Sequence, residues 1–389
     1  MRVAVTGMGV VSAAGVGVDA LLAALRRTDW MLSPSRFLKT TRQVPVGEVP
    51  YTNAELQQRY GLDPRKTYSR TSLLGIAAAT EALQSANLPK GSRIAFVSST
   101  TVGGMDLTEQ FYDCFRHDPQ KGRLRMVVHH DSADSTKTIA ETLGLQGFAT
   151  TISTACSSSA NAMLLGKRLL ETNWCDAVLV GGTDALCKFT LNGFASLMIL
   201  DNAPCRPFDE TRAGLNLGEG AAYLVMQRPE AATHAIGYLC GAANANDAHH
   251  QTATSAEGRG AQLAMRKALQ AAGLQPSDIH YINAHGTGTP NNDASESAAM
   301  SAVFGESVPP FSSTKPITGH CLAAAGSIEA VITLLALQQG EMWPSLNFKQ
   351  PMSGTSLRPI TSLTMCPIRY AMSSSFGFGG NCSTLIFEK

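Results

Sequence analysis

One cysteine stands where a chain could present a nucleophile. Cys156 lies in the run Thr-Ala-Cys-Ser-Ser-Ser-Ala at 154–160, among small residues, where an apolar segment gives way to a helical pattern. A thiol at a helix N-terminus lies near unpaired backbone N–H groups and the positive end of the helix dipole, which stabilise its thiolate. Small neighbours leave room for a thioester to approach. The pattern predicts a reactive cysteine, with a buried structural cysteine as the plainer alternative.

Two histidine motifs lie far downstream of this cysteine. His285 opens the run His-Gly-Thr-Gly-Thr-Pro at 285–290, and His320 ends the run Lys-Pro-Ile-Thr-Gly-His at 315–320. The first motif follows a predicted strand, so its ring and the hydroxyls of Thr287 and Thr289 should face an open cleft. Either histidine alone fits a structural role. Together with Cys156 they indicate Cys-His-His acyl chemistry.

Charged and glycine-rich segments surround the second histidine motif. Lys315 and Glu329 bracket His320 and could form a buried pair that orients its ring, although a plain structural ion pair is equally compatible. The run Ser-Ser-Ser-Phe-Gly-Phe-Gly-Gly-Asn at 373–381 has more glycines than we expect of a core strand. It is predicted to be a mobile cleft wall whose N–H groups, with that of Cys156, could hold an oxyanion, or else a tight aromatic turn.

Two other patterns resemble binding motifs and fail on detail. The run Gly-Met-Gly-Val-Val-Ser at 7–12 resembles a dinucleotide fingerprint, but Ser12 stands where the third glycine belongs, so no nucleotide site is expected. His249 and His250 are adjacent rather than four apart and lack a carboxylate in ligand register. We therefore assign them to a loop or the core and expect no transition metal.

Composition limits the class of protein. The 389 residues are 44% hydrophobic and 16% charged, which predicts one large domain or two closely packed halves. The 31 basic and 30 acidic side chains give no general attraction to nucleic acid or anionic membranes. Nine irregularly spaced cysteines fit a reducing cytoplasm better than a disulfide framework or a zinc site. The apolar run 330–337 is too short to cross a membrane and is predicted to be a buried helix.

Strand and helix patterns alternate along the chain, which predicts a layered α/β fold. Runs typical of buried strands are 2–6 (followed by a glycine loop), 93–98, 177–181, 221–226, 279–283 and 383–387. Runs with helical periodicity are 19–27, 70–86, 158–171, 260–272, 293–304 and 326–339. The rhythm repeats after about His234, and no flexible linker intervenes. We therefore expect two similar halves, 1–233 with the cysteine and 234–389 with both histidines, that share a large interface.

With these residues assembled, the chain resembles the condensing enzymes of the thiolase superfamily, most closely the type I and II β-ketoacyl-acyl-carrier-protein synthases. The resemblance runs nearly end to end. It rests on six ordered motifs, at 5–9, 154–157, 206–209, 285–290, 315–320 and 375–381. It implies a thiolase-like fold of two βαβαβαββ halves stacked as five α/β/α/β/α layers. It also implies a homodimer, or a heterodimer with a related ketosynthase or chain-length factor.

The resemblance implies a decarboxylative condensation on substrates carried by the phosphopantetheine of acyl carrier protein. Cys156 would accept the acyl primer, and His285 and His320 would hold the malonyl thioester oxygen while carbon dioxide leaves. The N–H groups of Cys156 and Phe378 would form the oxyanion hole, and Phe378 would act as a gate. Lys315 and Glu329 would support the second histidine.

Further residues take roles by the same resemblance. Thr287 and Thr289 would contact the pantetheine arm. Asn283, Glu329 and Ser373 match positions where some members hold a structural monovalent cation; no other metal or cofactor is expected. Arg65, Lys66 and Arg70, on a presumed surface helix, fit the docking region for the acidic carrier protein, although a solvated helix end would look the same.

The chain departs from the common family pattern in two places. Where an Asp-Gly-Phe step is common, residues 213–220 read Ala-Gly-Leu-Asn-Leu-Gly-Glu-Gly, and Asn292 replaces a common glycine. These changes put housekeeping membrane-lipid synthesis in question and raise a specialised pathway, making a polyketide, polyene or other acyl chain, as a second hypothesis; primers of different length and unsaturation would decide between them.

Other members of the superfamily fit less well. A degradative thiolase would need a second cysteine near Gly379, and a type III synthase would pair its cysteine with one histidine and an asparagine. The alternative from another class is a chain-length factor, a partner subunit that performs no condensation and typically lacks the nucleophile that Cys156 supplies here.

Overall fold

The strands repeat one five-strand pattern twice in the computed structural model, which describes all 389 residues. The N-terminal half contains β1 (Val3–Ser12), β5 (Ile94–Ser99), β6 (Ala149–Ile152), β7 (Ala177–Asp184) and β8 (Gly220–Gln227). The C-terminal half contains β9 (Gly237–Asn246), β10 (Tyr281–Asn283), β11 (Phe311–Ser312), β14 (Tyr370–Gly377) and β15 (Asn381–Glu388). In each half the first strand pairs antiparallel with the fifth and the fifth antiparallel with the fourth, whereas the fourth, second and third run parallel.

A short pairing between the first strands of the two halves joins them into one continuous sheet. Val3, Ala4 and Val5 of β1 lie opposite Leu239, Tyr238 and Gly237 of β9. The combined order is β11-β10-β14-β15-β9-β1-β8-β7-β5-β6, so β6 and β11 are its free edges. The internal duplication predicted from the sequence rhythm is thus explicit in the strand order.

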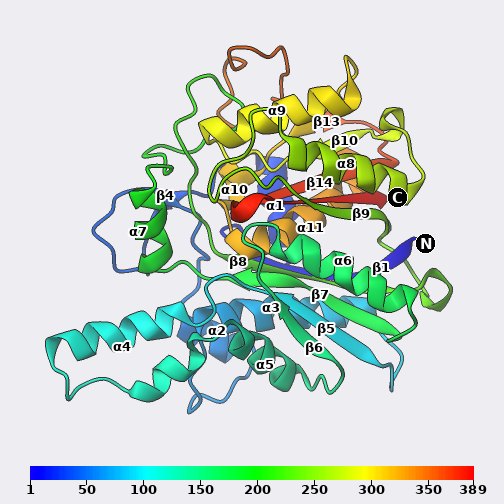
Figure 1. The fold of residues 1–389 in the computed structure, drawn as a ribbon. Helices are drawn as coiled ribbons and strands as arrows, with labels where there is room; N and C mark the ends of the chain where they lie inside the picture. The colour runs from blue at the N-terminus through cyan, green and yellow to red at the C-terminus, as the bar shows by residue number, and fades with distance from the viewer.

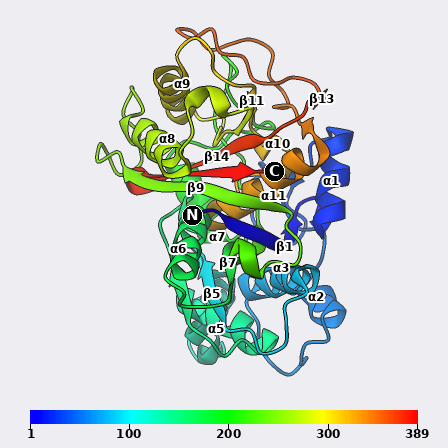
Figure 2. The same ribbon diagram turned by 90° about the vertical axis from the view of Figure 1, so that its right-hand side faces the viewer.

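Helices cover and separate the two halves of the sheet, as Figures 1 and 2 show. Helices α3 (Arg70–Ala86) and α5 (Ser132–Leu143) pack outside the N-terminal strands, and α8 (Arg259–Ala272) and α9 (Pro290–Phe304) pack outside the C-terminal strands. Helices α6 (Ser158–Glu171) and α11 (Ala325–Gln339) lie between them in the largest apolar cluster. The five-layered α/β/α/β/α architecture is confirmed.

Helix α11 is the core of the one helical segment that is long and apolar enough to cross a membrane. The segment Leu322–Gln339 spans 18 residues with a mean hydropathy of 1.4, long and apolar enough to cross a membrane, yet 89% of it is buried inside the protein. A core helix with apolar neighbours on all sides has the same composition. The predicted burial of residues 330–337 is confirmed.

The predicted glycine loop after the first strand is wrong. Strand β1 continues through Gly7 and Gly9 to Ser12. A Cβ on Gly7 would lie 2.2 Å from the carbonyl oxygen of Ala82, and one on Gly9 would lie 2.2 Å from that of Ala78. The glycines therefore let α3 approach the strand closely and do not interrupt it.

The glycine-rich run near the C-terminus is only partly a loop. Ser373 to Gly377 belong to the buried strand β14, and a short 3-10 turn, η5 (Phe378–Gly380), leads into β15. A Cβ on Gly377 would lie 2.8 Å from the carbonyl oxygen of Thr154 and 3.1 Å from the backbone nitrogen of Cys156. The expectation that no core strand would hold these residues is wrong, because the glycine is needed where β14 meets the cysteine turn.

The remaining elements lie mainly at the edges. They are β2 (Gly15–Val16), α1 (Val18–Arg27), β3 (Ser33–Pro34), β4 (Pro45–Val46), α2 (Asn53–Arg59), α4 (Met105–His117), η1 (Leu124–His130), α7 (Lys188–Ser196), η2 (Pro229–Ala231), η3 (Pro276–Asp278), α10 (Lys315–Thr318), η4 (Leu322–Ala324), β12 (Glu341–Met342) and β13 (Thr364–Met365). Helices α4 and α7 project to one side of the molecule (Figure 1).

Candidate active site

Cys156 lies in the turn that joins β6 to α6. It precedes Ser157, the N-cap residue, and is only 6% exposed. Ala155, immediately before it, has a φ of 53°, a left-handed conformation that is uncommon outside glycine. The hydroxyl and N–H of Ser158 both donate to the Ala155 carbonyl and hold the bend. The turn therefore aims the thiol in a fixed direction from the start of the helix.

His320 lies against the thiol. Its Nε2 is 3.0 Å from Sγ of Cys156. The backbone of His320 is held on both sides, because its N–H donates to the Asn216 carbonyl at 2.8 Å and its carbonyl accepts from Gly218 N–H at 2.9 Å. This geometry allows a proton to pass between sulfur and imidazole without movement of the main chain.

His285 follows β10 and faces His320. The two ring centroids are 5.3 Å apart at an interplanar angle of 84°. Nζ of Lys315 lies 2.5 Å from the His285 carbonyl oxygen and 3.4 Å from Nδ1. An ammonium can only donate, so Nδ1 is the acceptor and the neutral ring carries its proton on Nε2. His285 thus presents a hydrogen-bond donor toward the cavity.

Lys315 and Glu329 form a buried ion pair beneath the histidines. Nζ of Lys315 donates to Oε1 of Glu329, and the two side chains are 2% and 4% exposed. Burial, and then the positive charge of Lys315, lower the pKa values of His285 and His320 well below the ordinary value. Both imidazoles are therefore neutral at pH 7, and each can serve as a neutral donor or base.

The expectation of a stabilised thiolate at Cys156 is wrong for the free protein. Burial raises the pKa of the Cys156 thiol to about 12, and the attraction of Lys315 offsets only part of that rise. The site therefore holds a neutral thiol next to a neutral imidazole. Attack on a thioester must be coupled to proton transfer onto Nε2 of His320.

Two buried carboxylates that the sequence analysis missed hold the His-Gly-Thr-Gly-Thr loop. Glu296 accepts from the N–H groups of His285 and Gly286, both at 2.8 Å, and burial raises its pKa to about 8. Asp293 accepts from the N–H groups of Phe208 and Gly288. Both lie on α9, directly after the loop, and that position is the sequence signal that could have found them.

A cavity of about 320 Å³ opens onto the reactive residues. Its lining includes Cys156, His285, His320, Thr287 and Thr289, and the two threonine hydroxyls are 2.9 Å apart. Lining residues that sequence reasoning did not place there are Leu197, Met198, Ile199, His250 and Asn291. Asn291 directly follows the His-Gly-Thr-Gly-Thr-Pro motif, whereas the segment 197–199 carries no distinctive motif. His249 and His250 lie in an exposed loop, as predicted.

A second cavity, of about 170 Å³, lies on the other side of the cysteine. Eight of its ten lining residues are hydrophobic, and Cys156, Phe194 and Phe378 line both cavities. The rings of Phe194 and Phe378 are stacked, with centroids 5.7 Å apart and an interplanar angle of 18°. A stacked aromatic pair therefore lies between the 320 Å³ cavity, a channel with polar and apolar lining residues, and the apolar 170 Å³ pocket.

The wall of the apolar pocket is fixed by a further buried carboxylate. Asp184 accepts from the hydroxyl and N–H of Thr101, from Val102 N–H at 3.2 Å and from Ala323 N–H at 2.8 Å. Because Thr101 and Val102 line the pocket and Ala323 follows His320, this residue ties the pocket to the catalytic turn. Sequence analysis did not identify Asp184, since one aspartate at a strand end is not distinctive.

Buried polar atoms of Asn283, Ser373 and Glu329 lack protein partners. Asn283 and Ser373 face each other across β10 and β14, and the Asn283 amide, the Ser373 hydroxyl and Oε2 of Glu329 are all buried without a hydrogen bond. Buried orphan oxygens of this kind require a water or an ion. Their oxygens are the kind of ligand that such a cation takes, so the residues present fit the monovalent cation that the resemblance implies.

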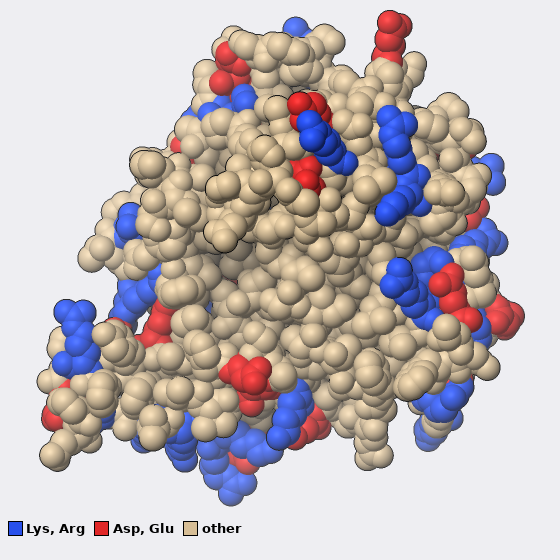
Figure 3. All heavy atoms as spheres, in the orientation of Figure 1, with Lys and Arg blue, Asp and Glu red and all other residues tan.

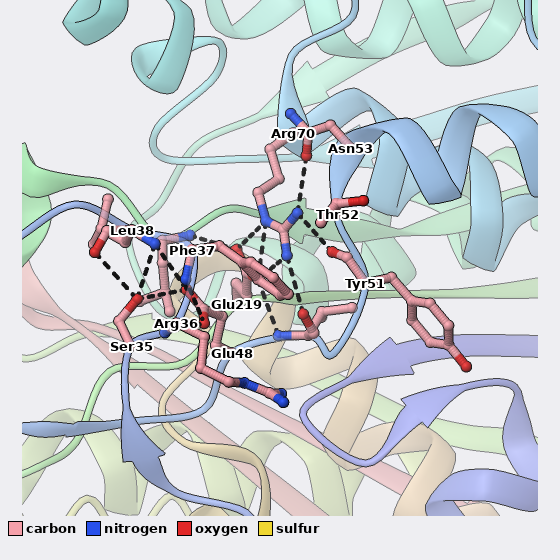
Figure 4. A network of polar contacts seen from close by, with 12 residues as sticks. Ser35, Arg36, Phe37, Leu38, Glu48, Tyr51, Thr52, Asn53, Arg70 and Glu219 are labelled. Carbon is pink, nitrogen blue, oxygen red and sulfur yellow. Dashed lines mark hydrogen bonds and ion pairs between the residues drawn. The ribbon is translucent and has the colours of Figure 1, made fainter.

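The assignment of Arg70 to a surface docking helix is wrong. Arg70 is the first residue of α3, is 8% exposed, and contacts both carboxylate oxygens of Glu219 through Nε at 2.9 and 2.8 Å (Figure 4). It also donates to the Tyr51 carbonyl and to Asn53. The guanidinium is satisfied inside the protein, so it ties the segment before α2 to the Gly-Glu-Gly turn.

Arg65 and Lys66 are exposed, as predicted, but in a turn rather than on a helix. They line an open groove together with Arg125 and Lys137. Asp63 accepts from Arg65 through Nε and Nη2, both at 3.0 Å, so part of this positive charge is neutralised. Lys and Arg side chains gather along the edge of the molecule below α2 and α5 (Figure 3).

A thiol paired with a neutral imidazole inside a duplicated five-layered fold is typical of the condensing enzymes of the thiolase type, acyltransferases that form carbon–carbon bonds. Comparison with known proteins makes the class specific. Residues 1–232 match the family described as Beta-ketoacyl synthase, N-terminal domain, and residues 236–349 match Beta-ketoacyl synthase, C-terminal domain. The chain belongs to the β-ketoacyl synthase family.

Individual relatives agree over the whole length. A 3-oxoacyl-[acyl-carrier-protein] synthase 2 of Staphylococcus aureus (strain MRSA252) is 30% identical, covering 100% of this chain and 98% of its own. The structure of the ishigamide ketosynthase/chain length factor superposes with a TM-score of 0.94 at 29% identity, covering 100% and 99%. A ketosynthase in complex with its chain length factor from Xenorhabdus doucetiae superposes with a TM-score of 0.84 at 32% identity, covering 100% and 98%.

Proposed function

We propose that this chain is a β-ketoacyl-acyl-carrier-protein synthase that condenses malonyl-carrier protein with an acyl primer held on Cys156. The observation that carries the proposal is the contact of 3.0 Å between Nε2 of His320 and Sγ of Cys156, with the donor face of His285 opposite. A non-catalytic subunit would have no use for this arrangement.

In the first half-reaction, sulfur attacks the thioester carbonyl of the primer. The thiol proton passes to Nε2 of His320, the new bond forms between Sγ and the acyl carbon, and the bond to the pantetheine sulfur breaks. The leaving thiolate takes the proton from His320. Because Gly377 lies against the amide of Cys156, the N–H groups of Cys156 and Phe378 are the donors we assign to the tetrahedral oxyanion.

In the second half-reaction, the malonyl thioester occupies the same channel. The bond to its carboxylate breaks, carbon dioxide leaves, and the electron pair delocalises onto the thioester oxygen. Nε2–H of His285 donates to that oxygen, and His320, whose Nε2 no longer faces a thiol, donates in its other neutral tautomer. The enolate carbon attacks the acyl carbonyl, Cys156 leaves as thiolate, and a solvent proton restores the thiol.

The remaining residues take supporting roles in this proposal. The pantetheine arm lies along the 320 Å³ channel beside Thr287 and Thr289, and the acyl chain enters the 170 Å³ pocket past Phe378. A monovalent cation would take the unpaired oxygens of Asn283, Glu329 and Ser373 as its ligands. No other cofactor is assigned, because the substrates bring their own carrier.

The carrier protein docks, in this proposal, on the groove that contains Arg65, Lys66 and Arg125, in the cytoplasm. Replacing Arg65 and Lys66 by Glu should raise KM for carrier-bound primer several-fold, because the partner is acidic. KM for the same acyl group on free pantetheine should not change. An equal rise for both would place docking elsewhere.

A second ketosynthase-like chain should cover the face that contains the free edge of β6. Phe148 and Trp174, beside this edge, are 42% and 61% exposed, and the surface in front of α6 and β6 carries few charged side chains (Figure 3). An unpaired strand edge with apolar neighbours favours pairing with another chain. Mass measurement in solution, alone and after co-expression with a chain-length factor, distinguishes a homodimer from a heterodimer; a monomer in both would contradict this assignment.

The condensation itself is tested with carrier-bound substrates. Purified protein is given acyl-carrier protein and malonyl-carrier protein, and the carrier-bound product is weighed. A β-keto product two carbons longer than the primer supports the proposal. Primers that differ in length and unsaturation then separate an ordinary fatty-acid role from the specialised polyene or polyketide role that the changes at 213–220 raise.

Release of no product, alone and with a co-expressed partner, would favour the chain-length-factor alternative. The neighbours named above include ketosynthase and chain-length-factor assemblies. The intact contact between Cys156 and His320 favours the catalytic member of such a pair.

A further inference from the structure

One buried amide lies where three walls of the reactive channel meet. Asn216, in the unusual run 213–220, is 1% exposed. Its Oδ1 accepts from Cys205 N–H at 2.6 Å, and its Nδ2 donates to the carbonyls of Asp201 at 3.0 Å and Ala203 at 3.1 Å. Both donors of the amide and its acceptor are thus engaged by one loop, residues 201–205.

The main chain of the same segment connects that loop to the second histidine. The Asn216 carbonyl accepts from His320 N–H at 2.8 Å. One residue earlier, Leu215 forms two backbone hydrogen bonds with the segment 199–201. Its N–H donates to the Ile199 carbonyl at 2.8 Å, and its carbonyl accepts from Asp201 N–H at 2.9 Å. Ile199 lines the channel, so the segment lies between a channel wall and His320.

The loop held by Asn216 also supports the third wall. A Cβ placed on Gly288 would lie 2.8 Å from the Gly214 carbonyl oxygen and 3.3 Å from Cβ of Cys205. Gly288 stands between Thr287 and Thr289, whose hydroxyls line the channel. Its close approach to Cys205 therefore depends on where the amide of Asn216 places the loop.

We propose that Asn216 is a positioning residue. By holding residues 201–205 in place, it sets the position of the channel walls relative to His320 and so determines how well the pantetheine arm fits the channel. This inference rests on the proposed function for the identity of the arm. An apolar side chain of similar size would leave three buried backbone groups of residues 201–205 without partners. The loop would then move toward water and carry the walls at Ile199 and Gly288 with it.

The test compares two reagents that alkylate the same sulfur. Chloroacetyl-pantetheine must enter the channel, whereas chloroacetamide is small; in both cases Cys156 loses its proton and displaces chloride. Peptide mass spectrometry gives the rate constant for alkylation of Cys156 by each reagent. The rate constant for chloroacetyl-pantetheine divided by that for chloroacetamide measures how much the channel accelerates the reaction of the pantetheine reagent. Fit along a long arm is sensitive to small displacements, so this ratio should fall about tenfold in Asn216→Leu. Asn216→Asp keeps the acceptor for Cys205 but sets a carboxylate oxygen against the carbonyls of Asp201 and Ala203, so the ratio should fall in this variant as well.

The control is Tyr223→Phe, which removes a buried hydroxyl paired with Ser98 at 2.6 Å within the N-terminal half and touches no channel wall. It should lower stability without changing the ratio. An unchanged ratio in Asn216→Leu, or in Asn216→Asp if the first variant does not fold, would overturn the proposal. A fall of the same size in Tyr223→Phe would overturn it as well. If wild-type protein shows no preference for the pantetheine reagent, the channel does not bind pantetheine. That result would contradict this part of the proposed function, and the role of Asn216 would fail with it.

Discussion

The two halves of the molecule have the same strand order but use equivalent turns differently. In the N-terminal half, Cys156 comes four residues after the end of β6 and two before α6 begins. In the C-terminal half, His320 comes eight residues after the end of β11 and five before α11 begins. The longer turn contains α10 and with it Lys315. Similarly, the end of β5 leads to the pocket wall at Val102, whereas the end of β10 leads to His285.

This difference divides the chemistry. The N-terminal half contributes a neutral thiol and most of an apolar pocket, which suit the storage of an acyl chain. The C-terminal half contributes two neutral imidazoles over the Lys315–Glu329 pair, which suit a carbanion next to a thioester oxygen. The two copies of the fold therefore form two half-sites with different chemistry. We expect that mutations in one half-site can block one half-reaction and leave the other intact.

The largest effect is expected at the N-terminal turn. Cys156→Ala should abolish condensation, a loss of about 10⁴-fold or more, because the nucleophile is gone. Release of carbon dioxide from malonyl-carrier protein should persist, because the C-terminal half-site is intact. Labelled carbon dioxide is counted for both proteins; loss of decarboxylation in the variant would show that the half-sites are not separable.

The ion pair under the histidines should matter next. Lys315→Met leaves Glu329 buried without its partner and should lower the free energy of unfolding by about 3–5 kcal/mol. Lys315→Met/Glu329→Leu should recover much of that loss while activity stays low, because His285 then lacks the donor that fixes its tautomer. Denaturant unfolding and rate measurements on both variants provide the comparison; full activity in the double variant would reduce the pair to a structural role.

A smaller effect, confined to one step, is expected at the C-terminal turn. His285→Ala should lower decarboxylation by about 10²–10³-fold, the size seen when one oxyanion donor is removed. Acylation of Cys156 should remain within a few-fold of wild type, since His320 is untouched. Equal losses in both steps would mean that His285 also serves the nucleophile.

The smallest effect concerns pH and the protonation state of Cys156. With the pKa of the thiol raised to about 12 by burial, its alkylation by iodoacetamide should rise about tenfold per pH unit between pH 7 and 9, without a plateau, in a His320→Ala variant that has no imidazole beside the sulfur to take the proton. The raised pKa also affects stability. Above pH 9 the thiol of the unfolded chain loses its proton while that of the folded protein keeps it, so the free energy of unfolding falls as pH rises. Peptide mapping, with exposed Cys114 as reference, measures the rate; a plateau below pH 8 would restore the thiolate predicted from the sequence.

Sequence patterns predicted much of the architecture and the reactive residues. Helices α3 and α6 begin and end at the predicted residues, 70–86 and 158–171, because their apolar periodicity and small residues continue unbroken. Cys156 was found because it lies among small residues where an apolar segment gives way to a helical pattern, and His285 because it follows a predicted strand and opens a Gly-Thr-Gly-Thr run. His320 was found because its Gly-His turn precedes small residues that lead into an apolar helix.

What the sequence could not predict depends on contacts between distant segments. The glycines of β1 looked like a loop until α3 was placed against them, and Arg70 looked solvated until Glu219, 149 positions away, was placed beside it. The protonation of Cys156 likewise follows from burial, which local sequence does not specify. Asp184, Glu296 and Asn216 were missed because each hydrogen-bonds to backbone groups that only the fold brings near.

The most direct measurement is the intact mass of the protein after incubation with acyl-carrier protein alone, for wild type, Cys156→Ala and His285→Ala, followed by malonyl-carrier protein. The account predicts one acyl group on wild type and on His285→Ala and none on Cys156→Ala. Only wild type should then lose that group to a β-keto product two carbons longer. An unacylated wild type, or a His285→Ala protein that fails at the acylation step, would contradict the division of the chemistry between the two halves.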